Sequence, residues 1–564
     1  MKGDRIIVSM LMLLTLGGLG ASLSDEAHPV RIAECGPERI VMEFICPQAR
    51  LESVTVNGER YDSVSLQGAE LSAEEGRPDL PQFGSMVAIP PNSVYSISYE
   101  LSEPQIFEDV KPLPVRDASR SLMLSPDYYE SAPYPSRQVI AGEAMYLRDF
   151  RVLPLQTCPF SWEPSTNTLT RYGHIRINID LSYPKGDSGS IPYTGYSYAF
   201  KNLYEARIQN FSAYRDLESG PQNARVLIIH GHNTDPVFIS KLDEFVTWKR
   251  QKGFIVSVAS TQVAGTTNSA IKSYIQAQYD DPGTRPDFII LVGDVAGSCA
   301  VPTFFETESE FNAEGDYPYT YLSGDDMLGD AFIGRLSAED VSQLLTLYNK
   351  VYTYEKTVNI NPPASDWMNR MLVIGDPTTS GISCAYTARF IKEIAQRANP
   401  DYSFVENYTS GFVSTINSGL NQGVGFFAYR GYAGVSGWSP STSVVNGFKL
   451  PHAVILTCQT GSFAGTSLSE QIIRMGTESV PAGAATCIAM ASPGTHTSFN
   501  NALISGIMSG VFCHGMRTMG EALLNGRLYL HEIYGATQPA FVRSLAHWCN
   551  LMGDPTLETW VGVA

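Results

Sequence analysis

One cysteine of the chain stands where an apolar run stops and a tight turn begins. Residues 453–457 are predicted to form a buried strand, and Cys458 follows them directly, ahead of Gln459, Thr460 and Gly461. In open α/β sheets, chemistry is carried out at the carboxyl ends of the strands. A thiolate at this point is a nucleophile, and the N–H groups of a turn can bind an oxyanion. An inert thiol packed beside a strand is the alternative interpretation.

A glycine-rich segment precedes this cysteine by about 25 residues. The predicted strand 425–429 runs into Tyr429-Arg-Gly-Tyr-Ala-Gly434, and glycines stand at 423, 425, 431, 434 and 437. Repeated glycines are typical of a loop whose backbone approaches a ligand closely. An ordinary glycine-rich turn has the same composition, so the spacing alone leaves both interpretations open.

Several segments resemble the gingipain family of secreted bacterial cysteine peptidases. The most specific are residues 425–438, 450–463 and 470–501; residues 331–338 and 550–555 are similar to family signatures, and residues 76–90 resemble the start of the family's propeptide domain. The resemblance covers nearly the whole mature chain. It implies a caspase-like fold and a cysteine endopeptidase made as a zymogen, with Cys458 as the nucleophile.

The sequence departs from the family at the general base. The family's Tyr-x-Gly-His-Gly loop aligns with residues 429–433, so Tyr432 stands at the position of the histidine and Ala433 at that of the second glycine. Ala433 still offers an N–H that would hold the oxyanion together with the N–H of Cys458. A tyrosine, whose pKa is about 10, cannot become the cation that ionises a thiol. Without such a cation, a thiol of pKa about 8.5 is only about 3% thiolate at pH 7.

Other histidines are weighed as substitutes by their place on the predicted strands. His452 begins the strand that leads to Cys458, which puts it about 20 Å away and excludes it. His230 and His232 follow the strand 225–229, and His496 follows the strand 484–491, so all three are expected at carboxyl ends of strands. We prefer His496 as the substitute base; a loop histidine without a catalytic role is the alternative.

The resemblance also suggests residues around the nucleophile. Trp438 and Thr495, in two of the matching segments, are expected to contact the substrate. Activation by cleavage between the two parts of the chain is expected at Arg207, Arg215 or Arg225, and the chain's own prodomain is expected to inhibit until then. The partners are thus a protein or peptide substrate and the prodomain.

The pattern of elements predicts two parts. Residues 25–185 are β-rich, with strict alternation over 174–181 and a hairpin at Asn57-Gly58, and residues 185–222 are interpreted as a polar linker. Apolar runs then alternate with helical stretches, which indicates parallel sheets. We predict a signal peptide (1–24), an all-β sandwich-like prodomain (25–215), a first α/β half (216–365) and a second, catalytic half (366–564). The fold class is α/β caspase-like, with two doubly wound, mostly parallel halves.

The N-terminus and the net charge limit where the protein can act and what it can bind. Lys2 and Arg5 precede an apolar run over 6–19 and small residues at 20–24, which is typical of a secretory signal peptide. No other segment is apolar enough to span a membrane, so the mature chain is expected to be secreted or at the cell surface. The formal net charge of −18 argues against nucleic-acid binding. Nine scattered cysteines indicate neither a zinc site nor a disulfide scaffold.

Several carboxylates are candidates for lesser roles. Asp294 and Asp376 stand at the ends of predicted strands, where each is expected to stabilise a turn or to cap a helix. Asp325, Asp326 and Asp330 form an acidic loop that is either solvated or a site for Ca²⁺ or for a basic substrate side chain. No cofactor is required by the expected reaction, and no metal site is placed.

Two functions therefore remain. The first is a zymogen of a cysteine endopeptidase acting through a Cys458 thiolate, with Tyr432 or His496 handling protons. The second is a catalytically impaired pseudopeptidase that uses the same cleft to bind peptides or surfaces. The retained cysteine favours the enzyme, and Tyr432 favours the pseudopeptidase.

Overall fold

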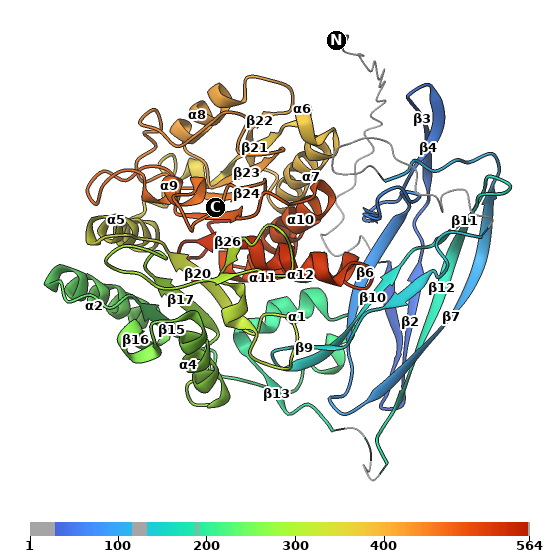
Figure 1. Ribbon diagram of the computed structural model, residues 1–564, viewed down its shortest axis with the longest axis horizontal. Helices are drawn as coiled ribbons and strands as arrows, with labels where there is room; N and C mark the ends of the chain where they lie inside the picture. Colours follow the sequence, from blue (N-terminus) through green and yellow to red (C-terminus); the bar gives the residue numbers. More distant parts are fainter. Residues whose placement is uncertain (1–28, 116–131, 186–188, 190, 562–564) are drawn as a thin grey trace.

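The computed structural model describes residues 29–115, 132–185, 189 and 191–561. An N-terminal all-β domain lies against a larger α/β domain, as Figure 1 shows. The predicted signal peptide, residues 1–24, lies outside the described residues. None of the helices in the described ranges is long and apolar enough to cross a membrane.

The N-terminal domain is built from two five-stranded antiparallel sheets and a hairpin. The first sheet joins β1 (Val30–Cys35), β2 (Arg39–Ile45), β12 (Thr168–Ser182), β11 (Phe160–Glu163) and β7 (Val94–Phe107). The second joins β5 (Glu70–Leu71), β6 (Pro81–Ala88), β10 (Phe150–Thr157), β8 (Val139–Ala141) and β9 (Met145–Leu147). β3 (Arg50–Val56) and β4 (Glu59–Ser65) form the hairpin, whose Asn57-Gly58 turn takes positive φ at both residues.

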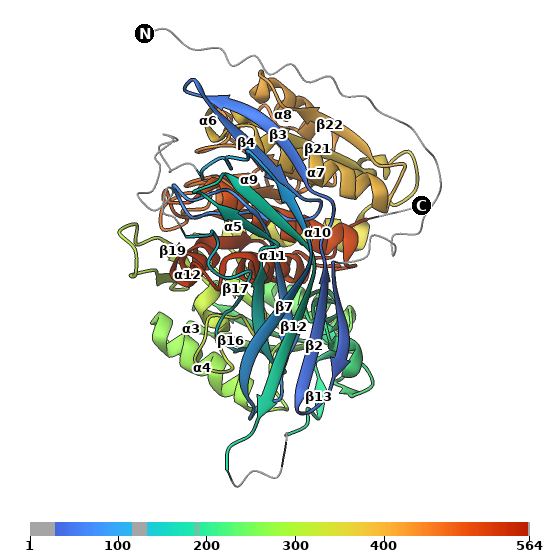
Figure 2. The same ribbon diagram turned by 90° about the vertical axis from the view of Figure 1, so that its right-hand side faces the viewer.

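The alternation of buried and exposed side chains along the strands decides which face of each sheet is buried. Side chains along β12 are buried at every second position, as the predicted strand over 174–181 requires. Figure 2 shows β7 and β12 as a long pair on the outside of the domain. The predicted sandwich-like domain is confirmed.

The predicted linker is wrong as a description of residues 195–213. This segment forms β13 (Gly195–Tyr196), which pairs with β14 (Glu218–Ser219), followed by η2 (Tyr198–Phe200), α1 (Lys201–Arg207) and η3 (Phe211–Ala213). Phe200 stacks on Phe332 of the α/β domain with ring centroids 4.3 Å apart, and the edge of Tyr204 meets Phe150 of the N-terminal domain at 4.9 Å. The predicted linker 185–222 is mostly polar, but the aromatic side chains of residues 195–213 bind both domains together.

A ten-stranded sheet runs through the whole α/β domain. Its order is β16 (Ile255–Ser260), β15 (Arg225–His230), β17 (Phe288–Val292), β20 (Phe332–Leu336), β26 (Cys549–Met552), β25 (Thr486–Met490), β24 (His452–Ile455), β23 (Phe426–Arg430), β21 (Arg370–Gly375) and β22 (Ser403–Asn407). Every neighbouring pair is parallel except β25 with β26. The strands of the first half therefore run opposite to those of the second.

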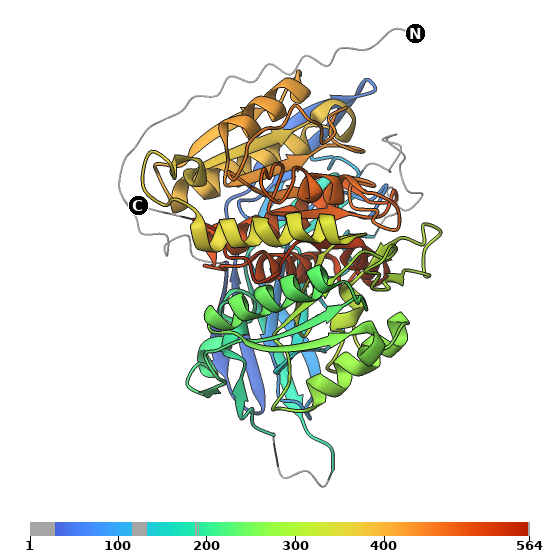
Figure 3. The same ribbon diagram turned by 90° about the vertical axis from the view of Figure 1, so that its left-hand side faces the viewer.

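Helices cover both faces of this sheet. The longer ones are α2 (Pro236–Gln251), α4 (Asn268–Asp280), α5 (Val341–Tyr352), α7 (Ser383–Ala398), α8 (Phe412–Gln422), α10 (Thr497–Cys513), α11 (Met519–Tyr534) and α12 (Pro539–Trp548). Shorter elements are α3 (Thr261–Ala264), α6 (Pro377–Ser380), α9 (Leu468–Arg474), β18 (Phe304–Phe305), β19 (Glu314–Gly315), η4 (Tyr317–Thr320), η5 (Thr353–Thr357) and η6 (Asp366–Asn369). In the second half, α7 and α10 pack on one face and α8 and α9 on the other. Figure 3 shows α2 and α5 side by side over the first half.

The N-terminal domain docks on α11. Strands β6 and β10 pack along this helix, and a Cβ built at Gly84 of β6 would lie 2.4 Å from the backbone of Glu532. Gln82 donates to the carbonyl oxygen of Ile533 at 3.3 Å, and the hydroxyl of Tyr529 donates to Glu70 at 3.1 Å. The close approach requires glycine at position 84.

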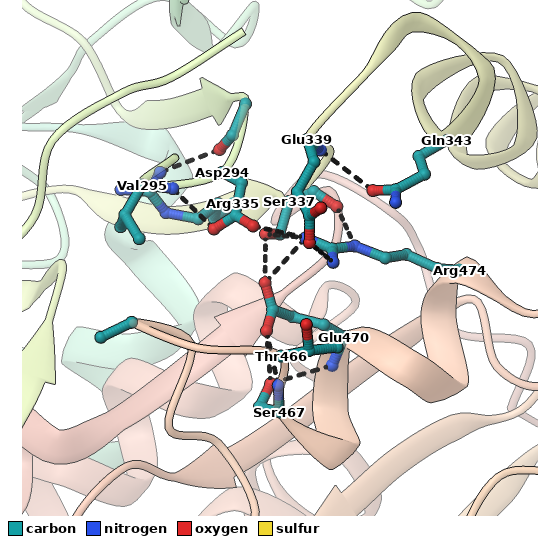
Figure 4. Close-up of polar contacts among 12 residues, drawn as sticks. Asp294, Val295, Arg335, Ser337, Glu339, Gln343, Thr466, Ser467, Glu470 and Arg474 are labelled. Atoms are coloured by element: carbon teal, nitrogen blue, oxygen red, sulfur yellow. Dashed lines mark hydrogen bonds and ion pairs between the residues drawn. The ribbon is translucent and has the colours of Figure 1, made fainter. Parts of the chain in front are cut away.

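A buried ion-pair network ties the two halves of the sheet together (Figure 4). Arg474, at the end of α9, pairs with Asp294 after β17 at 2.9 Å and with Glu470 at 2.8 Å. Glu470 also accepts from Ser337, which follows β20, at 2.6 Å. Asp294 accepts from the N–H of Val295, which is the turn role expected for it, and its second oxygen joins the network.

Candidate active site

The carboxyl ends of four neighbouring strands bring the candidate residues to one edge of the second half. Asp376 follows β21, Arg430 ends β23, Cys458 follows β24, and Thr495 follows β25. Because the first half runs in the opposite direction, the carboxyl end of β15 lies at the other edge of the sheet. His230 and His232 lie there and cannot serve Cys458; that part of the prediction is wrong.

The turn at Cys458 leaves this residue partly accessible. Cys458 is half-buried, whereas Thr457 before it is buried. Gln459 takes the left-handed conformation with φ +59°, and Thr460 closes the turn by donating to the carbonyl oxygen of Thr457 at 2.8 Å. Gly461 donates to Met490, and a Cβ on Gly461 would lie 2.9 Å from the backbone of Ala489. This turn needs glycine at 461 because it passes directly over β25.

The expected oxyanion hole is not assembled in this geometry. The N–H of Cys458 donates to the carbonyl oxygen of Tyr432 at 3.2 Å, and the N–H of Gly434 donates to the carbonyl oxygen of Cys458 at 3.3 Å. These bonds make Ala433 and Cys458 a parallel bridge pair. In such a bridge the N–H of Ala433 itself points away from Cys458. The two N–H groups therefore do not converge on one point.

Tyr432 lies next to the nucleophile through its backbone. Its carbonyl oxygen receives the Cys458 N–H, and the residue is 53% exposed. Its phenol stands in the solvent-facing layer of the site.

Thr495 contacts the sulfur through its hydroxyl and, at 3.9 Å, through its backbone carbonyl oxygen. Cys458 Sγ lies 3.1 Å from Thr495 Oγ1, and Asn500 Nδ2 donates to the same oxygen at 2.8 Å. Sequence reasoning expected Thr495 to contact substrate; the structure places it on the nucleophile instead.

His496 serves as the N-cap of α10. Its Nδ1 accepts from the N–H of Ser498 at 3.2 Å, and its ring meets the edge of Phe499. Burial and the nearby charge of Arg430 lower the pKa of His496. A ring that accepts at Nδ1 and resists protonation is a poor cation and a poor base for Cys458. Among the described contacts, none joins His496 to the sulfur, so the structure does not support it as the substitute base.

Arg430 places a buried cation beneath the site, which sequence reasoning missed. It is 1% exposed, and its guanidinium donates to Asn501 Oδ1 at 2.7 Å, to the carbonyl oxygen of Thr497 at 3.2 Å and to that of Leu456. None of these partners is a carboxylate. Burial lowers the pKa of Arg430, and the nearby thiols of Cys384 and Cys458 act in the opposite direction. The signal in the sequence was a charged residue closing the apolar run 425–429.

Trp438 does not line the site surface. It is 4% exposed, its Nε1 donates to Asn417 at 2.9 Å, and its ring meets Phe427 at 6.0 Å. The prediction that Trp438 contacts substrate is wrong in this geometry, because the glycine-rich loop folds the indole into the core.

Asp376 acts as the helix cap that was expected. It accepts from the N–H of Thr378 at 2.9 Å at the start of α6, and its other oxygen accepts from Ser436. Ser436 also bonds the hydroxyl of Tyr429 at 2.6 Å. These contacts tie the end of β21 to the loop that carries Tyr432.

The acidic loop serves to dock the N-terminal domain. Asp330 is buried and accepts from the backbone N–H groups of Arg148, Leu322 and Ser323 at 2.6–2.7 Å. Asp326 accepts from the N–H of Tyr146 at 2.7 Å. Their oxygens are engaged by the protein, so neither a Ca²⁺ site nor a substrate site is supported at these two carboxylates. Within the described residues, no group of three or more metal-ligating side chains is gathered.

The three candidate cleavage sites differ in accessibility. Arg207 is buried in α1 and pairs with Glu532 at 2.9 Å, and Arg225 begins strand β15. The side chain of Arg215 is 58% exposed and lies after η3, with Glu205 at 3.5 Å. Of the three, only Arg215 is placed where a protease could reach it without opening a helix or a strand.

Comparison with known proteins identifies both domains. The model of peptidase family C25 matches residues 219–560, and the C25 propeptide model matches residues 27–194. Lys-gingipain of Porphyromonas gingivalis is 24% identical over 428 residues, which cover 70% of this chain and 24% of the relative. Gingipain R2 of the same organism is 22% identical over 597 aligned residues, with 98% of this chain and 77% of the relative covered. The chain thus spans about a quarter of the length of its Lys-gingipain relatives.

Solved structures agree on the fold. The Arg-specific cysteine proteinase gingipain R matches with a TM-score of 0.52 and 20% identity, covering 60% of this chain and 78% of that one. The complex of the pro- and mature domains of RgpB from Porphyromonas gingivalis matches with a TM-score of 0.51 and 20% identity, covering 59% and 79%. The predicted caspase-like fold is therefore confirmed. The chain belongs to peptidase family C25, the gingipain family of cysteine peptidases, and carries that family's propeptide domain.

Proposed function

We propose that the protein is an exported cysteine endopeptidase made as a zymogen, with Cys458 as its nucleophile. The observation that carries the proposal is the place of Cys458, a half-buried residue just after the carboxyl end of β24, in a chain of the C25 family. An inert thiol would be expected to be fully buried, as Cys384 and Cys487 are.

The reaction needs a nucleophile and a proton donor. The Cys458 thiolate attacks the scissile carbonyl carbon, the C–N bond breaks, and the leaving nitrogen takes a proton. Tyr432 is the candidate donor, because its backbone bonds Cys458, the residue is 53% exposed, and it stands at the position of the family's histidine. Its phenolate then takes a proton from the water that hydrolyses the thioester, which restores the phenol. No step requires a cofactor.

Latency follows from the docked N-terminal domain and the closed oxyanion site. In the uncut chain the N–H of Cys458 is held by the carbonyl oxygen of Tyr432. We propose that cleavage at Arg215 releases the prodomain, residues 25–215, and lets the loop of residues 431–437 move so that this N–H meets the substrate.

A pseudopeptidase is the second candidate. It is favoured by Tyr432 at the histidine position together with the engaged Cys458 N–H. Such a protein would bind peptides in the same cleft without cleaving them.

One experiment separates the two candidates. Residues 25–564 are expressed, cut after Arg215, and assayed for hydrolysis of a quenched fluorescent peptide library and of casein. The enzyme predicts hydrolysis that appears on cutting, disappears in Cys458→Ala, and fails to appear in Arg215→Ala treated in the same way. If the cut chain hydrolyses no more than Cys458→Ala does, the endopeptidase proposal is wrong and the pseudopeptidase is supported.

A further inference from the structure

We propose that Thr495 and Arg430 together hold the Cys458 sulfur in its ionised form, the task for which a histidine is missing, and that Asn500 positions the Thr495 hydroxyl. The inference rests on the proposed function, since it takes Cys458 as the nucleophile. Thr495 contacts the reacting atom; Asn500 is a positioning residue, and Arg430 acts through its charge.

The direction of the Thr495 hydroxyl follows from its two contacts. Asn500 Nδ2 donates to Thr495 Oγ1 at 2.8 Å, which occupies a lone pair of that oxygen. The hydroxyl proton can then point to Cys458 Sγ at 3.1 Å, and it must do so when the sulfur is a thiolate, which has no proton to give; a neutral thiol has the Thr495 carbonyl oxygen at 3.9 Å as a second acceptor. A hydroxyl that donates to an anion forms a charge-assisted bond, stronger than one to a neutral thiol. The arrangement therefore favours the thiolate.

Arg430 supplies a fixed positive charge on the same side. It is buried, its hydrogen-bond partners are an amide and two backbone carbonyls, and its charge reaches Cys458. A buried cation without a carboxylate attracts an anion strongly, because little water screens it. Of the two thiols near it, Cys384 is buried and Cys458 is half-buried, so Cys458 is the one that can react as an anion.

One of the other titratable groups around this cluster is charged. Asp376, after β21, is a carboxylate whose pKa is lowered, against burial, by the hydrogen bonds from Ser436 and Thr378, and among the described contacts none joins it to Arg430. Burial lowers the pKa of His496, at the start of α10, which favours its neutral ring. The pKa of Tyr429 on β23 is raised to about 12 by burial, so its phenol is neutral as well. Tyr432 is the phenol on the exposed side, and Cys384 on α7 is a buried thiol.

Helix α10 carries both supports on consecutive residues. Asn500 bonds Thr495, and Asn501 bonds Arg430, so one turn of α10 fixes the hydroxyl and the guanidinium relative to each other. The amino end of this 17-residue helix also faces the site, which adds a partial positive charge. Asn500 and Asn501 are both buried, so their places are set by packing.

The test measures the sulfur directly, without turnover. Iodoacetamide alkylation of Cys458 is followed against pH by mass spectrometry in the full chain, uncut and cut, with the exposed Cys35 as internal reference. We expect the alkylation midpoint of Cys458 to lie at least one pH unit below that of Cys35. Thr495→Val, which keeps the shape and loses the hydroxyl, should raise the midpoint by about one unit, a tenfold loss of thiolate at pH 7. Thr495→Ser should restore it.

Two further variants separate the contributions. Arg430→Met should raise the midpoint by at least as much as Thr495→Val, and Asn500→Ala by less. Thermal melting by circular dichroism checks that each variant is folded. If Arg430→Met fails to fold, the Thr495→Val and Thr495→Ser pair still decides.

Each outcome bears on the inference separately from the function. Equal midpoints for wild type, Thr495→Val and Thr495→Ser would overturn the inference even if the cut chain hydrolyses peptides. A low alkylation midpoint of Cys458 that rises in Thr495→Val would support the inference even if no peptide is hydrolysed. In that case the absence of hydrolysis would refute the proposed function alone.

Discussion

Tyr432 is the residue on which the activity of the site depends most directly. A histidine at this half-exposed position would be able to carry a positive charge and to pass a proton to the leaving amine, which a phenol does poorly near neutral pH. We expect Tyr432→His to raise hydrolysis by the cut chain by about 10²-fold or more, in line with general acid–base catalysis. The measurement is the rate on the quenched peptide library.

Tyr432→Phe is the matched control, since it removes only the hydroxyl. If the phenol is the proton donor, Tyr432→Phe falls below wild type. Activity in Tyr432→His with none in wild type would identify the natural protein as a pseudoenzyme. A histidine variant no faster than the phenylalanine variant would contradict the assignment of this position to proton transfer.

At the same scale, the sequence predicts the nucleophile but not its supports. Cys458 could be found because an apolar run ends there and a glycine turn follows. Thr495 was expected at the substrate rather than on the sulfur, and Asn500 was not singled out, because a loop hydroxyl and a helix amide carry no pattern until the fold sets them 2.8 Å apart. Arg430 was hidden by the apolar run that buries it. The oxyanion prediction was wrong because a one-residue bridge decides where an N–H points.

At the scale of elements, α9 links the nucleophile loop to the first half of the sheet. Arg474 on this helix is buried with Asp294 and Glu470, and Glu339 lies at 2.9 Å on the exposed side. Burial raises the pKa of Glu470, and the charge of Arg474 opposes the rise. Removing the cation leaves two buried carboxylates unpaired. We expect Arg474→Met to lower the free energy of unfolding by about 3–5 kcal/mol.

The partly exposed member of the same network provides the comparison. Glu339→Gln removes one exposed ion pair and should cost about 1 kcal/mol or less. Urea unfolding followed by tryptophan fluorescence measures both variants. A loss for Arg474→Met no larger than that for Glu339→Gln would mean that the network does not hold α9 to β17 and β20.

Element type was predictable here, but element direction was not. Apolar runs and helical periodicity gave most of the strands and helices from 223 onward, because buried parallel strands are continuous apolar stretches. The antiparallel pairing of β25 with β26 left no such mark, so His230 and His232 were expected at the wrong edge. The prediction of a linker at residues 195–213 was wrong for another reason. Aromatic side chains of this segment pack in the core, although the composition of the surrounding residues is typical of a linker.

At the scale of the whole molecule, the two domains meet beside carboxyl groups whose pKa is raised by burial. Burial raises the pKa of Glu70 and of Asp79 in the N-terminal domain to about 7. Each carboxyl group also accepts a hydrogen bond, which acts in the opposite direction and lowers its pKa. Glu70 receives the hydroxyl of Tyr529, and both carboxyl groups face Tyr534 of α11. In a separated domain the same groups meet water and return to a pKa of about 4.

The sign of the pH dependence follows from this difference. Both pKa values are raised in the docked state, so docking binds protons; it is strongest at low pH and is weakened as the pH rises through about 7. We expect the affinity of the cut N-terminal domain for the α/β domain to fall at least tenfold between pH 5.5 and 7.5. Surface plasmon resonance with the separated domains measures this affinity.

The double variant Glu70→Gln, Asp79→Asn should flatten the dependence of the affinity on pH, because it removes the carboxyl groups that take up protons on docking. An unchanged slope in that variant would assign the pH dependence to other groups, and no slope in wild type would show that both carboxyl groups stay ionised when docked. A falling affinity would make the release of the N-terminal domain after cleavage depend on the pH of the surroundings.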